Sequence, residues 1–190
     1  MDPINLREGP VAVRLLSPQD AALLLKWMRD PRVLEFYGGR DLIYTPEKIQ
    51  EEFYVPEKGA RRCLVEFEGN PIGYIQIYQL DQELCREYHY PFRPEELAFG
   101  IDQFIGEPDL WNRGIGRRFL SLVLRHLTET EGAAAVILDP HANNPRALRC
   151  YQACGFRKLK FLPSHELHEG VWEDCWLMEY RPAKTDTDPP

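Results

Sequence analysis

The sequence lacks the features of a membrane-spanning, a secreted or a nucleic-acid-binding protein. No apolar run in the 190 residues approaches the ~20 residues that cross a bilayer. The first ten residues contain no basic segment followed by an apolar one, so we predict no secretory leader. Lys and Arg number only 23 against 30 Asp and Glu, whereas non-specific binding to nucleic acid needs a cationic surface. We therefore predict no membrane and no nucleic-acid partner.

Cysteine is also scarce. The five cysteines cannot all pair, and without a secretory leader we expect them to be reduced thiols in a cytoplasmic protein. Cys150 and Cys154 have a spacing that could hold a metal, but a buried thiol pair on one helix suits it better. His165 and His168 have no obvious third ligand. We therefore predict no metal site.

The chain is long enough for one domain with a substantial core, since 44% of its residues are hydrophobic. It has no internal repeat and no linker that would divide it. Only the end, from Pro182, lacks side chains that could pack. We therefore expect one domain over residues 1–181 and a disordered tail over residues 182–190, in a monomer or a dimer.

Strand and helix signals alternate along this domain. Ser17 and Thr45 each precede a proline in the pattern of a helix start, and further helices are expected over 114–127 and from Pro145 to near Gly155. Strands are expected at 11–16, 61–78 (a hairpin turning at 68–70), 97–102, 134–139, 156–161 and 172–180. The pattern predicts an α/β fold, mostly one sheet with helices on both faces.

Charge follows the chain in three blocks. Residues 81–109 contain eight acids and two arginines, and residues 110–160 contain nine basic residues and three acids. Residues 163–180 contain five acids and no Lys or Arg. Such runs are often solvated surface, but this order also suits an enzyme that holds a polyanionic cofactor beside a polycationic substrate.

A first motif, WNRGIGRR, spans residues 111–118 between a predicted strand and a long helix. Gly114 and Gly116 let the backbone approach a ligand closely, and the helix start offers unpaired N–H groups and the positive end of the dipole. This is a cradle for an anion such as pyrophosphate. A plain tight turn is an equally good interpretation of G-x-G alone.

A second motif, NPRALRCYQACGF, spans residues 144–156. Ala147 and Tyr151 share one face of the predicted helix, Asn144 lies one turn earlier, and Gly155 ends the helix. A single helical tyrosine is usually part of a core. Its position after an anion cradle, a helix and a strand is what makes a functional interpretation worth considering.

Together the two motifs resemble the acetyl-CoA site of the GCN5-related N-acetyltransferases (GNAT). The patterns of that family are Q/R-x-x-G-x-G/A and N-x-x-A-x-x-x-Y-x-x-x-G-F; the second matches fully, while Trp111 stands where the first has Gln or Arg. The resemblance implies the GNAT fold, with a central mixed, mostly antiparallel sheet flanked by helices, and acetyl-CoA as cosubstrate. The residues it implies for acetyl-CoA binding are Trp111, Arg113, Gly114, Ile115, Gly116, Arg117, Asn144 and Ala147.

Longer segments look like the aminoglycoside 6'-N-acetyltransferases, most of all the acetyltransferase half of the bifunctional acetyltransferase–phosphotransferase enzymes. The resemblance implies acetyl transfer to the 6' amine of aminoglycosides, and hence antibiotic resistance. The segments are RVLEFYGGRD (32–41), PIGYIQIY (71–78), GIDQFIGEPDLW (100–111), AVILDPHANNPRALRCYQACGF (135–156) and HELHEGVWEDCWLMEY (165–180).

Acetyl transfer to an amine needs a base, because ammonium cannot attack, and it is helped by an acid that protonates the departing thiolate. The resemblance implies that Asp102, in the segment Gly100–Gln103 at the end of a predicted strand, is the base. It implies that Tyr151 is the acid. A turn-capping aspartate and a core tyrosine are the alternatives.

A polycationic acceptor needs carboxylates around it. Asp139 matches the Asp-Pro that the family places beside the acceptor, and it ranks with Asp102 above the other candidates. Taken singly, each of the others fits an ordinary surface residue better than a ligand. They are Glu35, Tyr37, Asp41, Tyr54, Glu166, Glu169, Glu173 and Asp174.

Two other functions remain open. A GNAT enzyme could instead acetylate another small polyamine, a lysine side chain or a siderophore-precursor amine, and acidic residues would suit these acceptors too. An acyl-CoA-binding sensor without turnover would lack the base or the acid, whereas Asp102 and Tyr151 are both present.

Overall fold

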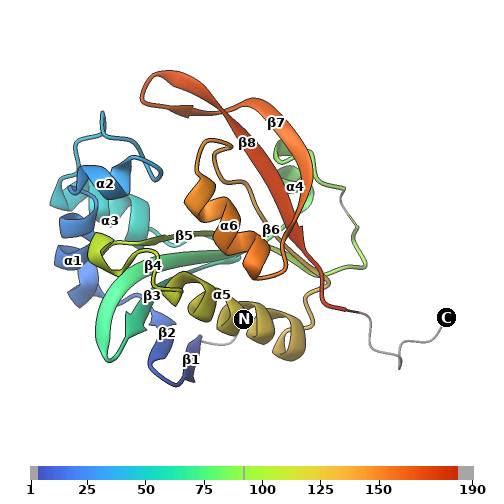
Figure 1. Ribbon diagram of the computed structural model, residues 1–190, viewed down its shortest axis with the longest axis horizontal. Coiled ribbons are helices and arrows are strands. Elements are labelled where there is room, and N and C mark those ends of the chain that lie inside the picture. The colour runs from blue at the N-terminus through green and yellow to red at the C-terminus, as the bar shows by residue number, and fades with distance from the viewer. Residues whose placement is uncertain (1–3, 92, 184–190) are drawn as a thin grey trace.

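The computed structural model describes residues 4–91 and 93–183, so most of the expected tail lies outside the described residues. Within them, one eight-stranded sheet has the order β1-β2-β3-β4-β5-β6-β8-β7 (Figure 1). Neighbouring strands are antiparallel except β5 and β6, which are parallel, so the expected mixed, mostly antiparallel sheet is confirmed. The strands are β1 (Asn5–Glu8), β2 (Val11–Leu15), β3 (Ala60–Phe67), β4 (Asn70–Gln79), β5 (Ala98–Ile105), β6 (Ala135–Leu138), β7 (Arg157–His168) and β8 (Val171–Tyr180).

Several helices begin where a capping side chain is followed by proline. In α3 the hydroxyl of Thr45 accepts a hydrogen bond from the backbone N–H of Lys48, and Pro46 is the first helical residue. In α6, Asn144 Oδ1 accepts one from the N–H of Ala147. The helical segments are η1 (Pro18–Asp20), α1 (Ala21–Trp27), α2 (Pro31–Leu34), α3 (Pro46–Tyr54), α4 (Gln82–Glu87), η2 (Pro108–Leu110), α5 (Ile115–Arg125), η3 (His126–Thr130) and α6 (Pro145–Ala153).

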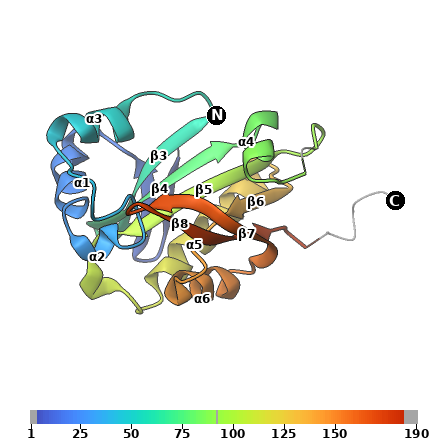
Figure 2. The same ribbon diagram turned by 90° about the horizontal axis from the view of Figure 1, so that it is seen from above.

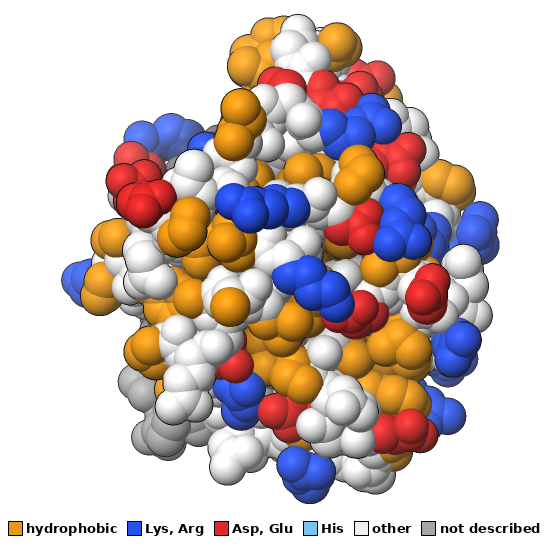
Figure 3. Space-filling model, turned by 90° about the vertical axis from the view of Figure 1, so that its left-hand side faces the viewer, with side chains coloured by type: hydrophobic (Ala, Val, Ile, Leu, Met, Phe, Trp, Pro, Cys, Tyr) orange, Lys and Arg blue, Asp and Glu red, His pale blue; other side chains and the backbone are white. Residues whose placement is uncertain are grey.

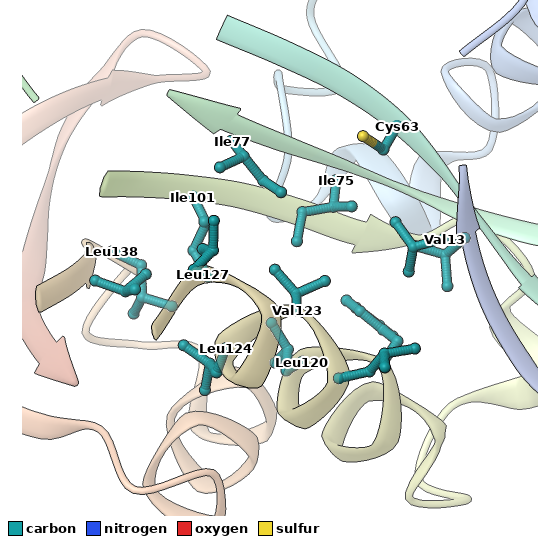
Figure 4. Close-up of a cluster of buried hydrophobic side chains, with 14 of the residues drawn as sticks. Val13, Cys63, Ile75, Ile77, Ile101, Leu120, Val123, Leu124, Leu127 and Leu138 are labelled. Carbon is teal, nitrogen blue, oxygen red and sulfur yellow. The ribbon is translucent and has the colours of Figure 1, made fainter. Parts of the chain in front are cut away.

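Side chains alternate along the central strands and so form a core on each face of the sheet. On one face, Ile75 and Ile101 join Leu120 of α5 in a buried apolar cluster (Figure 4). On the other face, Tyr74 and Phe104 belong to the cluster that α1 and α3 complete. Figure 2 shows α5 and α6 on one side of the sheet and α1 and α3 on the other. Consecutive residues of β5 therefore point to opposite sides of the molecule.

Some elements differ from the sequence-based expectation. The prediction that Asp102 ends a strand was wrong, because β5 stays paired with β4 as far as Ile105 and Asp102 lies inside it. Strands β7 and β8 are longer than expected, and β1, α2 and α4 were not anticipated. These three elements have only four to six residues each, too few for a clear hydrophobic period.

The β7–β8 hairpin extends beyond the rest of the sheet and reaches the segment that follows α2 (Figure 1). Near its tip, His168 Nε2 lies 3.0 Å from the backbone oxygen of Glu35. Arg40 and Glu169 form an ion pair at 2.6 Å beside it. The hairpin thereby joins the chain's last strands to its first helices.

The two parallel strands separate along their length. β5 and β6 pair only from Ala98 with Ala135 to Gly100 with Ile137. Beyond that point β5 continues beside β4, while β6 ends at Leu138. A gap therefore opens within the sheet at the carboxyl ends of its two parallel strands, where α/β proteins often bind ligands.

On the face of the molecule drawn in Figure 3, charges of one sign do not gather in a single patch. Acidic and basic side chains are interspersed there with apolar ones. Among residues 4–91 and 93–183, no helix is long and apolar enough to span a membrane. The gap between β5 and β6 is the candidate functional site.

Candidate active site

A cavity of about 920 Å³ occupies this gap. One side, the helix wall, is formed by residues within 114–117 at the start of α5 and within 144–151 of α6. The other side, the carboxylate wall, contains Asp102, Asp139 and Glu166. The predicted site residues that line the cavity are Tyr37, Asp102, Trp111, Gly114, Ile115, Gly116, Arg117, Asp139, Asn144, Ala147, Tyr151 and Glu166.

Asp102 projects from the middle of β5 into the cavity, which is not the place of a turn-capping residue. Among the described residues, its carboxylate accepts one hydrogen bond, from the Tyr78 hydroxyl at 3.5 Å. Burial, followed by the charges of Asp139 and Glu166, raises the pKa of Asp102 to about 7. A carboxylate with this pKa is a far better proton acceptor at neutral pH than an ordinary aspartate.

The next residue along β5, Gln103, points to the opposite face and contacts Tyr151 of α6. Gln103 Nε2 donates a hydrogen bond to the Tyr151 hydroxyl at 2.6 Å. Because this hydroxyl accepts the bond, its own proton remains free for another group in the cavity. Burial raises the pKa of Tyr151 above its usual value, so the phenol is protonated at neutral pH. Its position suits a proton donor.

The helix wall begins at the N-terminus of α5. Gly114 adopts a left-handed conformation, with φ of 73°, as the loop turns into the helix. The first intrahelical bond found there joins the N–H of Arg118 to the oxygen of Gly114, so the earlier N–H groups have no intrahelical acceptor. These N–H groups and the helix dipole suit an anion. A Cβ at Gly116 would lie 3.1 Å from Cys150 Sγ, so this glycine also lets α5 approach α6.

Trp111 and Arg146 connect the α5 loop to α6. Trp111 Nε1 donates to the oxygen of Ile105 at 2.8 Å, and the Arg146 guanidinium carbon lies 3.7 Å from the centre of the indole ring. Within the described residues, Arg146 forms no ion pair. Burial lowers the pKa of Arg146, but an arginine stays charged at neutral pH. Arg146 therefore adds a cationic group to the cavity lining, over the Trp111 ring.

The second motif forms α6 from its cap to its end. Asn144, which is buried, caps the helix through the N–H of Ala147, so its side-chain oxygen bonds a nearby backbone group. At the other end, Gly155 has φ of 96° and the N–H of Phe156 donates to the oxygen of Tyr151 at 3.1 Å. The conformation of this segment therefore follows from its own sequence.

The acids of the carboxylate wall are paired with histidines. Asp139 Oδ2 lies 3.2 Å from His165 Nε2; burial raises the pKa of Asp139, while the hydrogen bond raises that of His165. Glu166 Oε2 lies 2.9 Å from His141 Nε2, which raises the pKa of His141. Burial alone would raise the pKa of Glu166, but this bond and the charge of His141 lower it. Histidine can lose its proton near neutral pH, so a bound ammonium can replace it as partner.

Part of this wall has the residue types of a metal site. His141, Glu166 and Cys175 each place one potential ligand atom within 4.8 Å of the other two. Burial raises the pKa of the Cys175 thiol to about 12, whereas a metal binds the thiolate. His165 and His168 do not converge, because each bonds a different partner. The absence of a metal site remains a prediction.

Several predicted residues do not line the cavity: Glu35, Asp41, Tyr54, Arg113, Glu169, Glu173 and Asp174. Tyr54 donates its hydroxyl to the backbone oxygen of Ser17 at 2.7 Å, beneath α1 and α3. Glu169 accepts two side-chain hydrogen bonds from Arg40, at 2.6 and 2.7 Å. The structure therefore gives Tyr54 and Glu169 other partners than a ligand in this cavity.

Some groups at the cavity were not singled out from the sequence. Gln103 and Arg146 belong to the segments quoted above, and an unexplained polar residue beside a motif position was a signal that could have identified them. His141, His165 and Tyr88 also line the cavity. These residues reach the cavity only when distant strands fold together, so no local pattern predicts their place there; His165 was considered above only as a metal ligand.

Comparison with known proteins fits this geometry. Residues 17–163 match the Acetyltransferase (GNAT) domain family. The aminoglycoside N(6')-acetyltransferase type 1 of Klebsiella pneumoniae is 26% identical over 152 residues, which cover 78% of this chain and 74% of that protein.

Solved structures share the fold. The aminoglycoside acetyltransferase AAC(6')-Ib in complex with coenzyme A has a TM-score of 0.73 and 24% identity, over 90% of this chain and 94% of that one. The spermidine N-acetyltransferase of Vibrio cholerae, in complex with CoA and spermine, has a TM-score of 0.74 and 16% identity, over 92% and 96%. At these identities the structures support the fold alone, while the family match covers most of the chain. The chain belongs to the GNAT acetyltransferases, a family of enzymes that take the acetyl group from acetyl-CoA.

Proposed function

We propose that this acetyltransferase modifies the 6' amine of aminoglycoside antibiotics and so gives resistance to them. Asp102 is the general base and Tyr151 the general acid. The observation that carries the proposal is the arrangement of one cavity, with an anion cradle on one side, acids on the other and the raised-pKa carboxylate of Asp102 between them. The name of the Klebsiella pneumoniae relative supports the choice of acceptor.

The helix wall fits the anionic part of acetyl-CoA. A pyrophosphate would accept hydrogen bonds from the first N–H groups of α5, where the left-handed Gly114 leaves open space. Arg146 adds a cation over the ring of Trp111, the residue that replaces the Gln or Arg of the family pattern. The binding residues we propose are therefore those predicted from the motifs, together with Arg146.

Proton transfer follows from the two faces of β5. A primary amine enters as an ammonium, since the pKa of such groups in water lies well above 7. Asp102 removes one proton, and the freed nitrogen lone pair attacks the thioester carbonyl carbon. As the carbon–sulfur bond breaks, Tyr151 donates its proton to the sulfur, and the nitrogen of the new amide loses its second proton, which restores the Tyr151 phenol directly or through solvent. Asp102 then releases its proton to solvent, while the alignment of the two substrates supplies much of the rate.

The carboxylate wall fits a polycationic acceptor. Asp139 and Glu166 face the cavity together with Asp102, so several ammonium groups can each approach a carboxylate. Before a substrate binds, His165 pairs with Asp139 and His141 pairs with Glu166, which reduces the repulsion between the two carboxylates. Tyr37, whose ring lies 4.6 Å from that of Phe104 at an angle of 59°, supplies an apolar surface against which a sugar ring can pack.

A polyamine is the second candidate acceptor. The same acids would hold a linear chain of ammonium groups, and a spermidine acetyltransferase shares the fold. The two acceptors differ in shape, because an aminoglycoside presents rigid rings and a polyamine does not. The cavity of about 920 Å³ includes both walls, so it has to hold part of acetyl-CoA as well as the acceptor, and the name of the Klebsiella pneumoniae relative is what favours the aminoglycoside.

The deciding experiment compares acceptors with the same enzyme and acetyl-CoA. Kanamycin, which has a 6' amine, should be acetylated at that amine, whereas an analogue with a 6' hydroxyl should react at least ~100-fold more slowly. Spermidine and a lysine peptide serve as competing acceptors. Mass spectrometry that finds spermidine to be the best substrate, or equal rates on the two aminoglycosides, would contradict the proposal. Resistance conferred on a susceptible bacterium would support the physiological role. The cytoplasmic location and the monomeric or dimeric state of the protein stay predictions.

A further inference from the structure

Two tyrosine hydroxyls that the mechanism does not use lie behind Asp102. Tyr78 comes from β4, and Tyr88 follows the last turn of α4. The Tyr78 hydroxyl lies 2.8 Å from that of Tyr88 and 3.5 Å from Asp102 Oδ1. The three groups therefore form a row from the edge of the cavity to the proposed base.

The position of Tyr78 depends on a glycine. Tyr78 is directly opposite Gly100 in the β4–β5 register, and a Cβ at Gly100 would lie only 2.2 Å from the Tyr78 ring. The ring can therefore lie across β5 only because residue 100 has no side chain. Asp102 is two residues further along the same face, so the phenol oxygen ends beside its carboxylate.

The direction of the hydrogen bonds follows from the acceptor at the end of the row. An ionised carboxylate can only accept, so Tyr78 must donate its proton to Asp102. The Tyr78 oxygen is then free to accept, and Tyr88 donates to it. Hydroxyls in such a chain polarise one another, and this strengthens the bond to the carboxylate.

We propose that Tyr78 and Tyr88 are positioning residues that hold the Asp102 carboxylate toward the cavity and favour its ionised form. This inference rests on the proposed role of Asp102 as base. The hydrogen bond from Tyr78 opposes the effect of burial on the pKa of Asp102, which would otherwise lie higher. Burial in turn raises the pKa of Tyr78 and of Tyr88, so both hydroxyls keep the protons they donate.

Other ionisable groups around Asp102 also affect its ionisation. The acids oppose its ionisation, while the buried phenols are neutral and act on it only as dipoles. Asp139 carries its own histidine partner, His165. The groups are Tyr37 from the segment after α2, Tyr74 and Tyr78 from β4, Tyr88 after α4, Asp139 after β6, Tyr151 from α6, Glu166 from β7 and, further away, Glu57.

The test replaces each hydroxyl and measures kcat/KM for the aminoglycoside from pH 5.5 to 9. In Tyr78→Phe the acid limb of the profile should move up by about one pH unit, so that kcat/KM falls about tenfold at pH 6 and recovers by pH 9. Tyr88→Phe should move the limb in the same direction by less. Tyr90→Phe is the matched control, since Tyr90 is a buried tyrosine whose hydroxyl donates to Glu179 outside the cavity.

Each outcome has a distinct meaning when Asp102→Asn is measured alongside. Loss of activity in Asp102→Asn with shifted limbs in the Tyr78 and Tyr88 variants supports both proposals. Loss of activity with limbs at the wild-type pH in both tyrosine variants overturns the positioning role and leaves the base assignment intact. Full activity in Asp102→Asn overturns the base assignment itself. Should Tyr78→Phe fail to fold, as judged by thermal melting, the Tyr88→Phe limb decides the matter.

Discussion

The two walls of the cavity are built in different ways. The helix wall comes from short, contiguous segments, the start of α5 with its N–H groups and the capped helix α6. The carboxylate wall collects side chains from β5, from the residues after β6 and from β7, which are far apart in the chain. The contiguous wall can therefore be predicted from local sequence, while the composite wall depends on the tertiary fold.

The walls also differ in how they manage charge. The helix wall offers partial positive charges and an arginine without an acidic partner among the described residues. The carboxylate wall pairs its acids with His141 and His165, whose protons are exchangeable near neutral pH. The helix wall therefore has positive groups without an acidic partner among the described residues, and these suit an anion. The acids of the carboxylate wall are already paired with histidines, which bound cations can replace as partners.

The largest effect is expected at Asp102, which stands between the walls. Asp102→Asn keeps the size of the side chain but removes the basic site, so kcat should fall by roughly 10²–10⁴-fold. Acetyl-CoA affinity should hold, because the helix wall is untouched. Steady-state kinetics and calorimetry on one preparation measure both quantities, and a kcat within about threefold of wild type would exclude Asp102 as the base.

The same variant should not be less stable. The pKa of Asp102 is raised from 3.8 to about 7, so the folded state holds this proton more tightly than the unfolded chain does. Ionisation of Asp102 therefore costs folding stability as the pH rises above about 4, and the cost is complete above about 7. Asparagine has no charge to desolvate. Thermal melting at pH 8 should place Asp102→Asn at or above wild type, whereas a capping role would place it below.

A smaller effect is expected on the helix wall. Arg146→Ala should weaken acetyl-CoA binding about tenfold, because a charged hydrogen bond to a phosphate is lost, and should leave aminoglycoside affinity nearly unchanged. Arg118→Ala is the matched control, since Arg118 is an exposed residue of α5 outside the cavity lining. Calorimetry that finds equal acetyl-CoA affinity in the two variants would remove Arg146 from the binding site.

The sequence allowed the helix wall to be predicted nearly in full. Its motifs are local, so Gly114, Asn144 and Gly155 adopt the turn and cap conformations that their residue types favour. Asp102 and Asp139 were placed at the site by resemblance, and they line the cavity. Most strands were located by their own apolar residues, whereas β7 is mostly exposed and extends to His168, beyond the predicted 156–161.

The rest of the carboxylate wall depends on tertiary structure that no local pattern encodes. His141 meets Glu166 because the segment after β6 pairs with β8, which has β7 along its other edge, and Tyr88 reaches Tyr78 because α4 packs against the sheet. Glu169 looked equivalent to Glu166 in the sequence. The difference between them, a cavity on one side and Arg40 on the other, arises only when the hairpin is folded.

The different surroundings of Glu166 and Glu169 allow a test of whether the position of a carboxylate, and not only its charge, affects acceptor binding. Glu166 faces the cavity and stays ionised, because His141 lowers its pKa, so Glu166→Gln should raise KM for the aminoglycoside by up to about fivefold. Glu169→Gln removes the same charge from the same hairpin but breaks only an exposed ion pair with Arg40, and KM should change by less than about twofold. KM measured at 50 mM and 300 mM salt should differ more for wild type than for Glu166→Gln, since one cavity charge is gone. Equal KM values for both variants would mean that the wall acts through its total charge, and that the positions of its carboxylates do not select the acceptor.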